Sequence, residues 1–161
     1  MRPTFGSRGK STGGAYAKLK KPSVRSKIGP RILLIDDDAT IRELGRTLLV
    51  HGGFEVELLD HGPTDHAFYA SLSIDAAIVD LGLPGLNGAD VIANLRSVPK
   101  NTQLPIVICT SSVDIEAIHN CYTQHAALTV IQKPVDWPRL INLMNRAVGR
   151  RDIESSAVTI A

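Results

Sequence analysis

The sequence predicts an α/β fold with five parallel β-strands and helices on both faces of the sheet. From residue 31 to about residue 149, apolar strand-like runs alternate with segments of helical periodicity, which is typical of βα units. The central runs are almost unbroken aliphatic sequence, as expected for strands that helices cover on both sides. Because 43% of the residues are apolar but only 4% are aromatic, we expect an aliphatic core.

The first βα unit begins at residue 31. A strand at 32–35 leads to Asp38, which can cap a helix because its carboxylate accepts hydrogen bonds from the first helical amides. The Gly-Gly pair at 52–53 ends this helix. Its apolar face is predicted from residues at helical spacing: Ile41, Leu44 and Leu48.

The second and third units follow the same pattern. A short strand at 54–59 precedes a helix that is expected to begin at Pro63, because proline is favoured in a first helical turn, and to reach about Leu72. The third strand is predicted at 76–80. A loop with three glycines, 81–88, then leads into a helix whose apolar positions are Val91, Ile92, Leu95 and Val98.

The last two units complete the predicted sheet. A strand at 105–110 precedes a fourth helix, and a strand at 128–133 precedes a final helix that follows Asp136 and ends near residue 149. The apolar face of the fourth helix carries Ile115, Ile118 and Tyr122. That of the final helix carries Leu140, Leu143, Met144, Ala147 and Val148.

The chain divides into a basic arm at 1–30, an α/β domain at 31–149 and a short C-terminal tail at 150–161. Residues 1–31 contain nine of the 18 basic residues and none of the 16 acidic ones, so the remainder carries a net charge of −7. The arm lacks an apolar period, which predicts a flexible segment. It is either a solvated tail or a contact for nucleic acid, an acidic partner or an anionic membrane surface.

The cysteines and the apolar runs indicate a cytoplasmic protein without a membrane span. Cys109 and Cys121 lie in a strand pattern and a helix pattern and do not form the framework of a disulfide-rich secreted domain. The N-terminus lacks the apolar stretch of a signal peptide. No apolar run approaches the length of about 18 residues that a spanning helix requires.

Five functional side chains stand where four of the predicted strands end. Asp36 and Asp37 follow the first strand, Asp80 ends the third, Thr110 ends the fourth and Lys133 ends the fifth. Because the carboxyl ends of parallel strands share one edge of an open α/β sheet, we expect these side chains to converge there. Three carboxylates, a hydroxyl and an ammonium suit a divalent cation and a phosphoryl group.

With these residues in place, residues 31–149 resemble the receiver domain of two-component response regulators. The resemblance implies the flavodoxin-like strand order 2-1-3-4-5 and a cis peptide before Pro134. Each matching segment is a weak signal alone, but their order and spacing together are specific. The segments are 32–38, 80–88, 105–111 and Lys133-Pro134.

The resemblance also implies a role for each side chain. Asp80 would be the nucleophile that accepts a phosphoryl group. Thr110 would donate its hydroxyl to that group, and Lys133 would pair with Asp80 before the transfer and with the phosphoryl group afterwards. The cofactor would be Mg²⁺. Its implied ligands are Asp37, Asp80, the backbone carbonyl of Gly82, and Asp36 mainly through water.

Two functions are compatible with this resemblance. The first is a response regulator without a fused output domain, which receives its phosphoryl group from a sensor histidine kinase or a histidine phosphotransfer protein. It would promote hydrolysis of its own aspartyl phosphate and signal by contact with a downstream protein, or as a homodimer through the fourth helix, fifth strand and fifth helix. No DNA-binding module fits in the remaining residues.

The second function is an interaction module of the same fold that switches little on phosphorylation. Val130 favours it, because many receivers carry Tyr or Phe at this position as a rotameric switch. A metabolic enzyme is not expected. A related phosphatase that also attacks with Asp would need an acidic group two residues after Asp80, where Gly82 stands.

Overall fold

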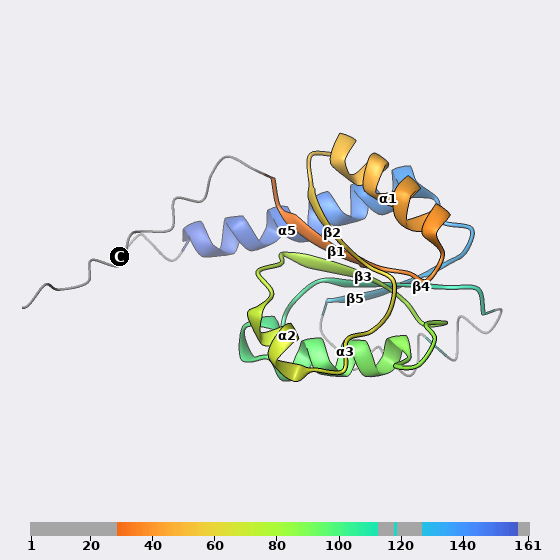
Figure 1. Ribbon diagram of the computed structural model, residues 1–161. Helices are drawn as coiled ribbons and strands as arrows, with labels where there is room; N and C mark the ends of the chain where they lie inside the picture. Colours follow the sequence, from red (N-terminus) through yellow and green to blue (C-terminus); the bar gives the residue numbers. More distant parts are fainter. Residues whose placement is uncertain (1–28, 113–117, 119–126, 158–161) are drawn as a thin grey trace, which may run out of the picture.

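The computed structural model confirms the predicted α/β fold (Figure 1) and describes residues 29–112, Ile118 and residues 127–157. Five parallel strands form one sheet in the order β2-β1-β3-β4-β5. The chain reverses its direction of travel across the sheet between β1 and β3, which is where open α/β sheets bind ligands. The strands are β1 (Arg31–Ile35), β2 (Glu55–Leu59), β3 (Ala76–Asp80), β4 (Ile106–Thr110) and β5 (Leu128–Gln132).

The helices cover both faces of the sheet. Figure 1 shows α1 and α5 on one face and α2 and α3 on the other. A short 3-10 helix follows α3. The helical bounds are α1 (Ala39–His51), α2 (His66–Ser71), α3 (Gly88–Ser97), η1 (Pro99–Asn101) and α5 (Trp137–Ala157).

Alternate residues of the central strands enter two separate cores. Leu33 and Ile35 of β1 pack in the core under α2 and α3, whereas Ile32 and Leu34 pack in the core under α1 and α5. This alternation follows from the two-residue period of a strand. Strands β3 and β4 are buried along their whole length, as their unbroken aliphatic sequences predict.

Helix α1 begins as predicted, and Ile41 and Leu48 of its predicted apolar face pack against the core under α1 and α5. The Asp38 carboxylate accepts hydrogen bonds from the amides of Thr40 and Ile41. Leu44, predicted on the apolar face, is 45% exposed, so that prediction is wrong. The buried positions are Leu49 and Gly45. At Gly45 a Cβ would lie 2.8 Å from Leu34 Cδ2 and 3.1 Å from a ring carbon of Trp137. Close approach of α1 to α5 therefore sets the rotation of the helix.

Helix α2 begins at His66, three residues later than predicted. The Asp65 carboxylate caps it by accepting a hydrogen bond of 2.8 Å from the Ala67 amide. Pro63 lies in the preceding coil, where its carbonyl accepts a hydrogen bond from the buried Tyr69 hydroxyl. The capping carboxylate, rather than the proline, determines where this helix starts.

Helix α5 continues to Ala157, eight residues beyond the predicted end. Val148 is its last core residue among the side chains that the structure describes. The segment 150–157 contains neither Gly nor Pro, so helical propensity allows the helix to continue. No described helix is long and apolar enough to cross a membrane. The predicted fourth helix lies outside the described residues, apart from Ile118, and so do Ile115 and Tyr122.

Gly88, the first residue of α3, packs against the backbone at the end of β3. A Cβ there would overlap the Asp80 carbonyl oxygen and lie 2.7 Å from Leu81 Cα, so Gly88→Ala should lower the free energy of unfolding by about 2 kcal/mol. Gly149 in α5 has open space around its Cβ position, and Gly149→Ala should raise that free energy by up to about 1 kcal/mol. Urea denaturation measures both. Equal effects of the two substitutions would contradict this packing.

Candidate functional site

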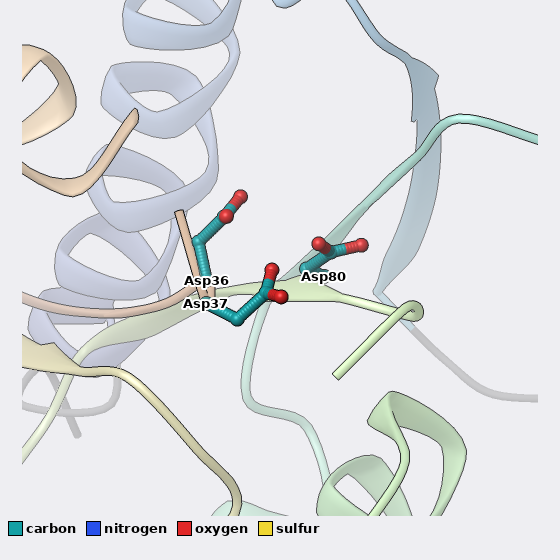
Figure 2. Close-up of side chains that lie close together, drawn as sticks. All are labelled: Asp36, Asp37 and Asp80. Atoms are coloured by element: carbon teal, nitrogen blue, oxygen red, sulfur yellow. The ribbon is translucent and has the colours of Figure 1, made fainter. Parts of the chain in front are cut away.

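The carboxyl edge of the sheet brings the three aspartates together. Asp36 and Asp37 follow β1, and Asp80 ends β3, which lies beside β1 with Ile35 paired to Val79. Each aspartate offers a carboxylate oxygen, and these three oxygens lie within 4.8 Å of one another. Figure 2 shows the three side chains at the ends of the neighbouring strands.

Lys133 bridges two of these carboxylates. Its Nζ donates to Asp36 Oδ2 at 2.7 Å and to Asp80 Oδ2 at 2.8 Å. The residue follows β5 immediately, and its amide donates to the Thr110 carbonyl, which extends the pairing of β4 and β5. The peptide between Lys133 and Pro134 is cis, as the resemblance implies.

The surroundings of Lys133 keep it protonated. Only 17% of its side chain is exposed. Burial lowers the pKa of this ammonium, but the hydrogen bonds and charges of Asp36 and Asp80 raise it by more, so the pKa lies above its usual value. Lys133 is therefore a fixed positive charge between two buried carboxylates at neutral pH.

Asp36 and Asp80 are held by hydrogen bonds to both of their oxygens. Asp36 is 1% exposed and Asp80 is 6% exposed. The second oxygen of Asp36 accepts from the Asp38 amide at 3.0 Å, and that of Asp80 accepts from the Gly82 amide at 2.9 Å. These donors and Lys133 compensate for the burial of the two charges.

Asp37 differs from the other two carboxylates because it is exposed. Within the described ranges, no protein group donates a hydrogen bond to its side chain. A carboxylate that is free of protein donors, beside two that are already oriented, leaves oxygen ligands available to a cation.

Thr110 ends β4 one residue after Cys109, which is paired with Asp80 in the sheet register, and Gly82 lies beside the Asp80 carboxylate. Thr110 is 5% exposed, and its Oγ1 accepts a hydrogen bond from the Ser112 amide at 3.1 Å, which leaves its own proton available. At Gly82 a Cβ would lie 3.6 Å from Asp80 Oδ1. The residue is exposed, and without a side chain it adds only backbone atoms beside Asp80.

Two residues near the site have packing roles. Val130 is partly buried against the core under α2 and α3. Cys109 is paired with Asp80 in the sheet register but belongs to the core under α1 and α5. Burial raises the pKa of the Cys109 thiol to about 12, so this cysteine is not a nucleophile at neutral pH.

One contact at the site was not predicted from the sequence. Arg42 of α1 donates from Nη1 to the backbone carbonyl of Asp36 at 2.7 Å. The only signal for it in the sequence is the position of Arg42 four residues after the capping Asp38. That position places it on the first turn of α1, and its amide donates to the Asp38 carbonyl.

Comparison with known proteins identifies the family. A family model described as the response regulator receiver domain matches residues 32–145. The sensory/regulatory protein RpfC of Xanthomonas campestris is 32% identical over 133 residues, which are 81% of this chain but only 18% of that protein. The chain therefore spans less than a fifth of this relative.

Solved structures agree with the fold. A response regulator receiver domain protein from Clostridium thermocellum is 25% identical, with a TM-score of 0.66 over 77% of this chain and 98% of that one. The receiver domain of a sensor histidine kinase from Pseudomonas aeruginosa is 24% identical, with a TM-score of 0.65 over 75% and 98% of the two chains. The family match, the strand order and the acidic cluster show that this chain belongs to the response regulator receiver family.

Proposed function

We propose that this chain accepts a phosphoryl group on Asp80 from a phosphohistidine donor and signals by protein contact. The donor would be a sensor histidine kinase or a histidine phosphotransfer protein, and the location would be the cytoplasm. The observation that carries the proposal is the bridge from Lys133 to Asp36 and Asp80 beside the exposed carboxylate of Asp37.

The carboxylates fit Mg²⁺. Magnesium prefers oxygen ligands at about 2.1 Å, and the 4.8 Å that contains the three carboxylate oxygens is little more than twice this length. Asp37, Asp80 and the Gly82 carbonyl would hold the ion directly, and Asp36 would act through water. The solved Pseudomonas receiver domain has a magnesium ion coordinated in its active site cleft. When bound, the ion neutralises charge on the phosphoryl oxygens during transfer.

Asp80 would act as the nucleophile. One of its oxygens forms the bond to phosphorus while the bond from phosphorus to the donor imidazole breaks, and that imidazole nitrogen then takes a proton from solvent. Water later attacks the phosphorus, which regenerates the Asp80 carboxylate and releases inorganic phosphate. The donor and the water would approach past Gly82, which has no side chain beside Asp80 Oδ1.

Lys133 and Thr110 would respond to the new group. Lys133 carries a fixed charge that pairs with Asp80 in the unphosphorylated state and with a phosphoryl oxygen afterwards. The free proton of the Thr110 hydroxyl would be donated to another phosphoryl oxygen. Because Thr110 Oγ1 also holds the Ser112 amide, movement of Thr110 would reach the start of the loop after β4.

The phosphorylated chain would signal by one of two routes. A homodimer through the fourth helix, β5 and α5 is one route, and a downstream protein that binds this face is another. An interaction module that switches little is the alternative, since Val130 packs in the core where an aromatic switch would stand. The basic arm at 1–30 would be either a solvated tail or a contact for nucleic acid, an acidic partner or an anionic membrane surface.

Phosphorylation by a small acyl phosphate tests the central step. In the presence of Mg²⁺ we expect intact-protein mass spectrometry to show the addition of one phosphoryl group. Asp80→Asn should abolish the addition because an amide is not a nucleophile for phosphorus. Asp90→Asn, which changes an exposed carboxylate on α3, should leave it unchanged. An unmodified wild-type chain would favour the alternative function.

Magnesium should stabilise the fold. At about ten times its dissociation constant, a ligand that binds only the folded state adds about 1.4 kcal/mol to the free energy of unfolding. Denaturant titrations in EDTA and in MgCl₂ measure this increment. Asp37→Asn should abolish the increment and raise stability in EDTA, because it removes one of three repelling charges. Identical curves for the wild type in EDTA and in MgCl₂ would count against a metal site.

Lys133→Met should destabilise the metal-free protein by about 3 kcal/mol at neutral pH, because two buried carboxylates lose their cation. The pKa of Lys133 is raised in the folded state. Its contribution is therefore complete below the usual lysine pKa of about 10.4 and is lost as the pH rises through the higher folded value.

Denaturant titrations of the wild type and Lys133→Met in EDTA, at a series of pH values, test this pH dependence. The difference in stability between wild type and Lys133→Met should shrink above the usual lysine pKa. Arg139→Met, which removes an exposed cation from α5, should have a small effect at every pH. A stability of Lys133→Met equal to that of the wild type at neutral pH would show that the bridge contributes nothing.

A further inference from the structure

The turn between β1 and α1 carries two of the three carboxylates, and one side chain of α1 reaches back to it. Arg42 Nη1 donates to the Asp36 backbone carbonyl at 2.7 Å. Arg42 is partly buried, and its own amide donates to the Asp38 carbonyl at 3.0 Å. The contact therefore joins the first turn of the helix to the peptide that links Asp36 and Asp37.

This peptide determines where the Asp37 carboxylate points. The Asp36 carbonyl and the Asp37 amide lie in one rigid plane. Rotation of that plane changes ψ of Asp36 and φ of Asp37, and so it moves the Asp37 side chain relative to β3. A hydrogen bond to the carbonyl opposes this rotation. Arg42 thus restrains the backbone that carries Asp37.

The other two carboxylates do not depend on such a restraint. Asp36 is oriented by Lys133 and by the Asp38 amide, and Asp80 is oriented by Lys133 and by an amide of its own loop. Asp37 has no comparable donor within the part of the chain that the structure describes. Its orientation toward Asp80 rests on its backbone.

We propose that Arg42 is a positioning residue for the metal site: it holds the peptide between Asp36 and Asp37 so that the Asp37 carboxylate faces Asp80. Because Mg²⁺ binding is part of the proposed function, this role depends on it. Asp37 is one of the two carboxylates proposed to bind the ion directly. The expected consequence of losing the restraint is a weaker affinity for Mg²⁺.

The positive charge of Arg42, taken alone, predicts the opposite change in Mg²⁺ affinity when Arg42 is removed. A guanidinium near a cation site repels the cation, so its removal would tighten Mg²⁺ binding if charge were all that mattered. The field of Arg42 does reach the neighbouring strand end. The pKa of Asp60 after β2 is lowered chiefly by its hydrogen bond with His61, and the Arg42 charge adds to this effect. The sign of the change in affinity therefore separates the two roles.

An amide NMR titration of the full chain with MgCl₂ measures the affinity, with the Gly82 amide beside Asp80 as the reporter. Arg42→Met removes both the charge and the donor, and it should weaken Mg²⁺ binding about ten-fold, as substitutions behind metal ligands do. Arg42→Lys keeps a charge and a donor, and it should retain most of the affinity. Arg46→Met removes an exposed charge one turn along α1 and should leave affinity unchanged.

Arg42→Met should impair Mg²⁺ binding rather than the transfer of the phosphoryl group. At saturating Mg²⁺, its phosphorylation rate with a small acyl phosphate should return to near the wild-type value. Wild-type or tighter affinity in Arg42→Met would overturn the positioning role and leave the proposed function standing. A wild-type chain that shows no Mg²⁺ binding would overturn both.

Discussion

The site depends on one electrostatic constraint: three carboxylates share a small volume with a single lysine. Two carboxylates about 4 Å apart repel each other by roughly 4 kcal/mol at an effective dielectric constant of 20. Lys133 relieves this repulsion for the two buried groups by bonding to both, and Asp37 remains exposed. Strands β1, β3 and β5 are parallel members of one sheet, so their carboxyl ends meet at one edge and keep these charges together. The fold thus holds together an acidic site whose charge Lys133 neutralises only in part, and such a site is suited to a divalent cation.

Much of the fold was predictable because its strongest signals are local. Each of these elements can be predicted from its own residues: β3 and β4 from their aliphatic runs, and the start of α1 from the capping carboxylate of Asp38. The strand order came from the resemblance to a family, not from periodicity. The rotation of α1 was not predictable, because it depends on how closely Gly45 approaches Trp137 from a distant part of the chain. The predicted start of α2 at Pro63 is wrong because the carboxylate of Asp65 caps the helix two residues later in the chain.

At the site, residue types were predictable from the sequence but hydrogen bonds were not. The five side chains at the strand ends could be selected by their position alone. That Lys133 contacts Asp36 as well as Asp80, while Asp37 stays exposed, depends on side-chain directions that the sequence does not encode locally. Arg42 was missed for the same reason, since a long charged residue on an amphipathic helix is usually a solvated one.

We propose that Asp37 and Asp80 bind a divalent cation next to the Asp80 oxygen that would accept the phosphoryl group. A crystal structure of the full chain grown with Mn²⁺, whose anomalous scattering identifies the ion, tests this most directly. The account predicts one ion in contact with the carboxylates of Asp37 and Asp80 and with the Gly82 carbonyl, with Lys133 still bonded to Asp80. An Asp37 carboxylate turned to solvent, or an ion bound only elsewhere on the chain, would contradict it.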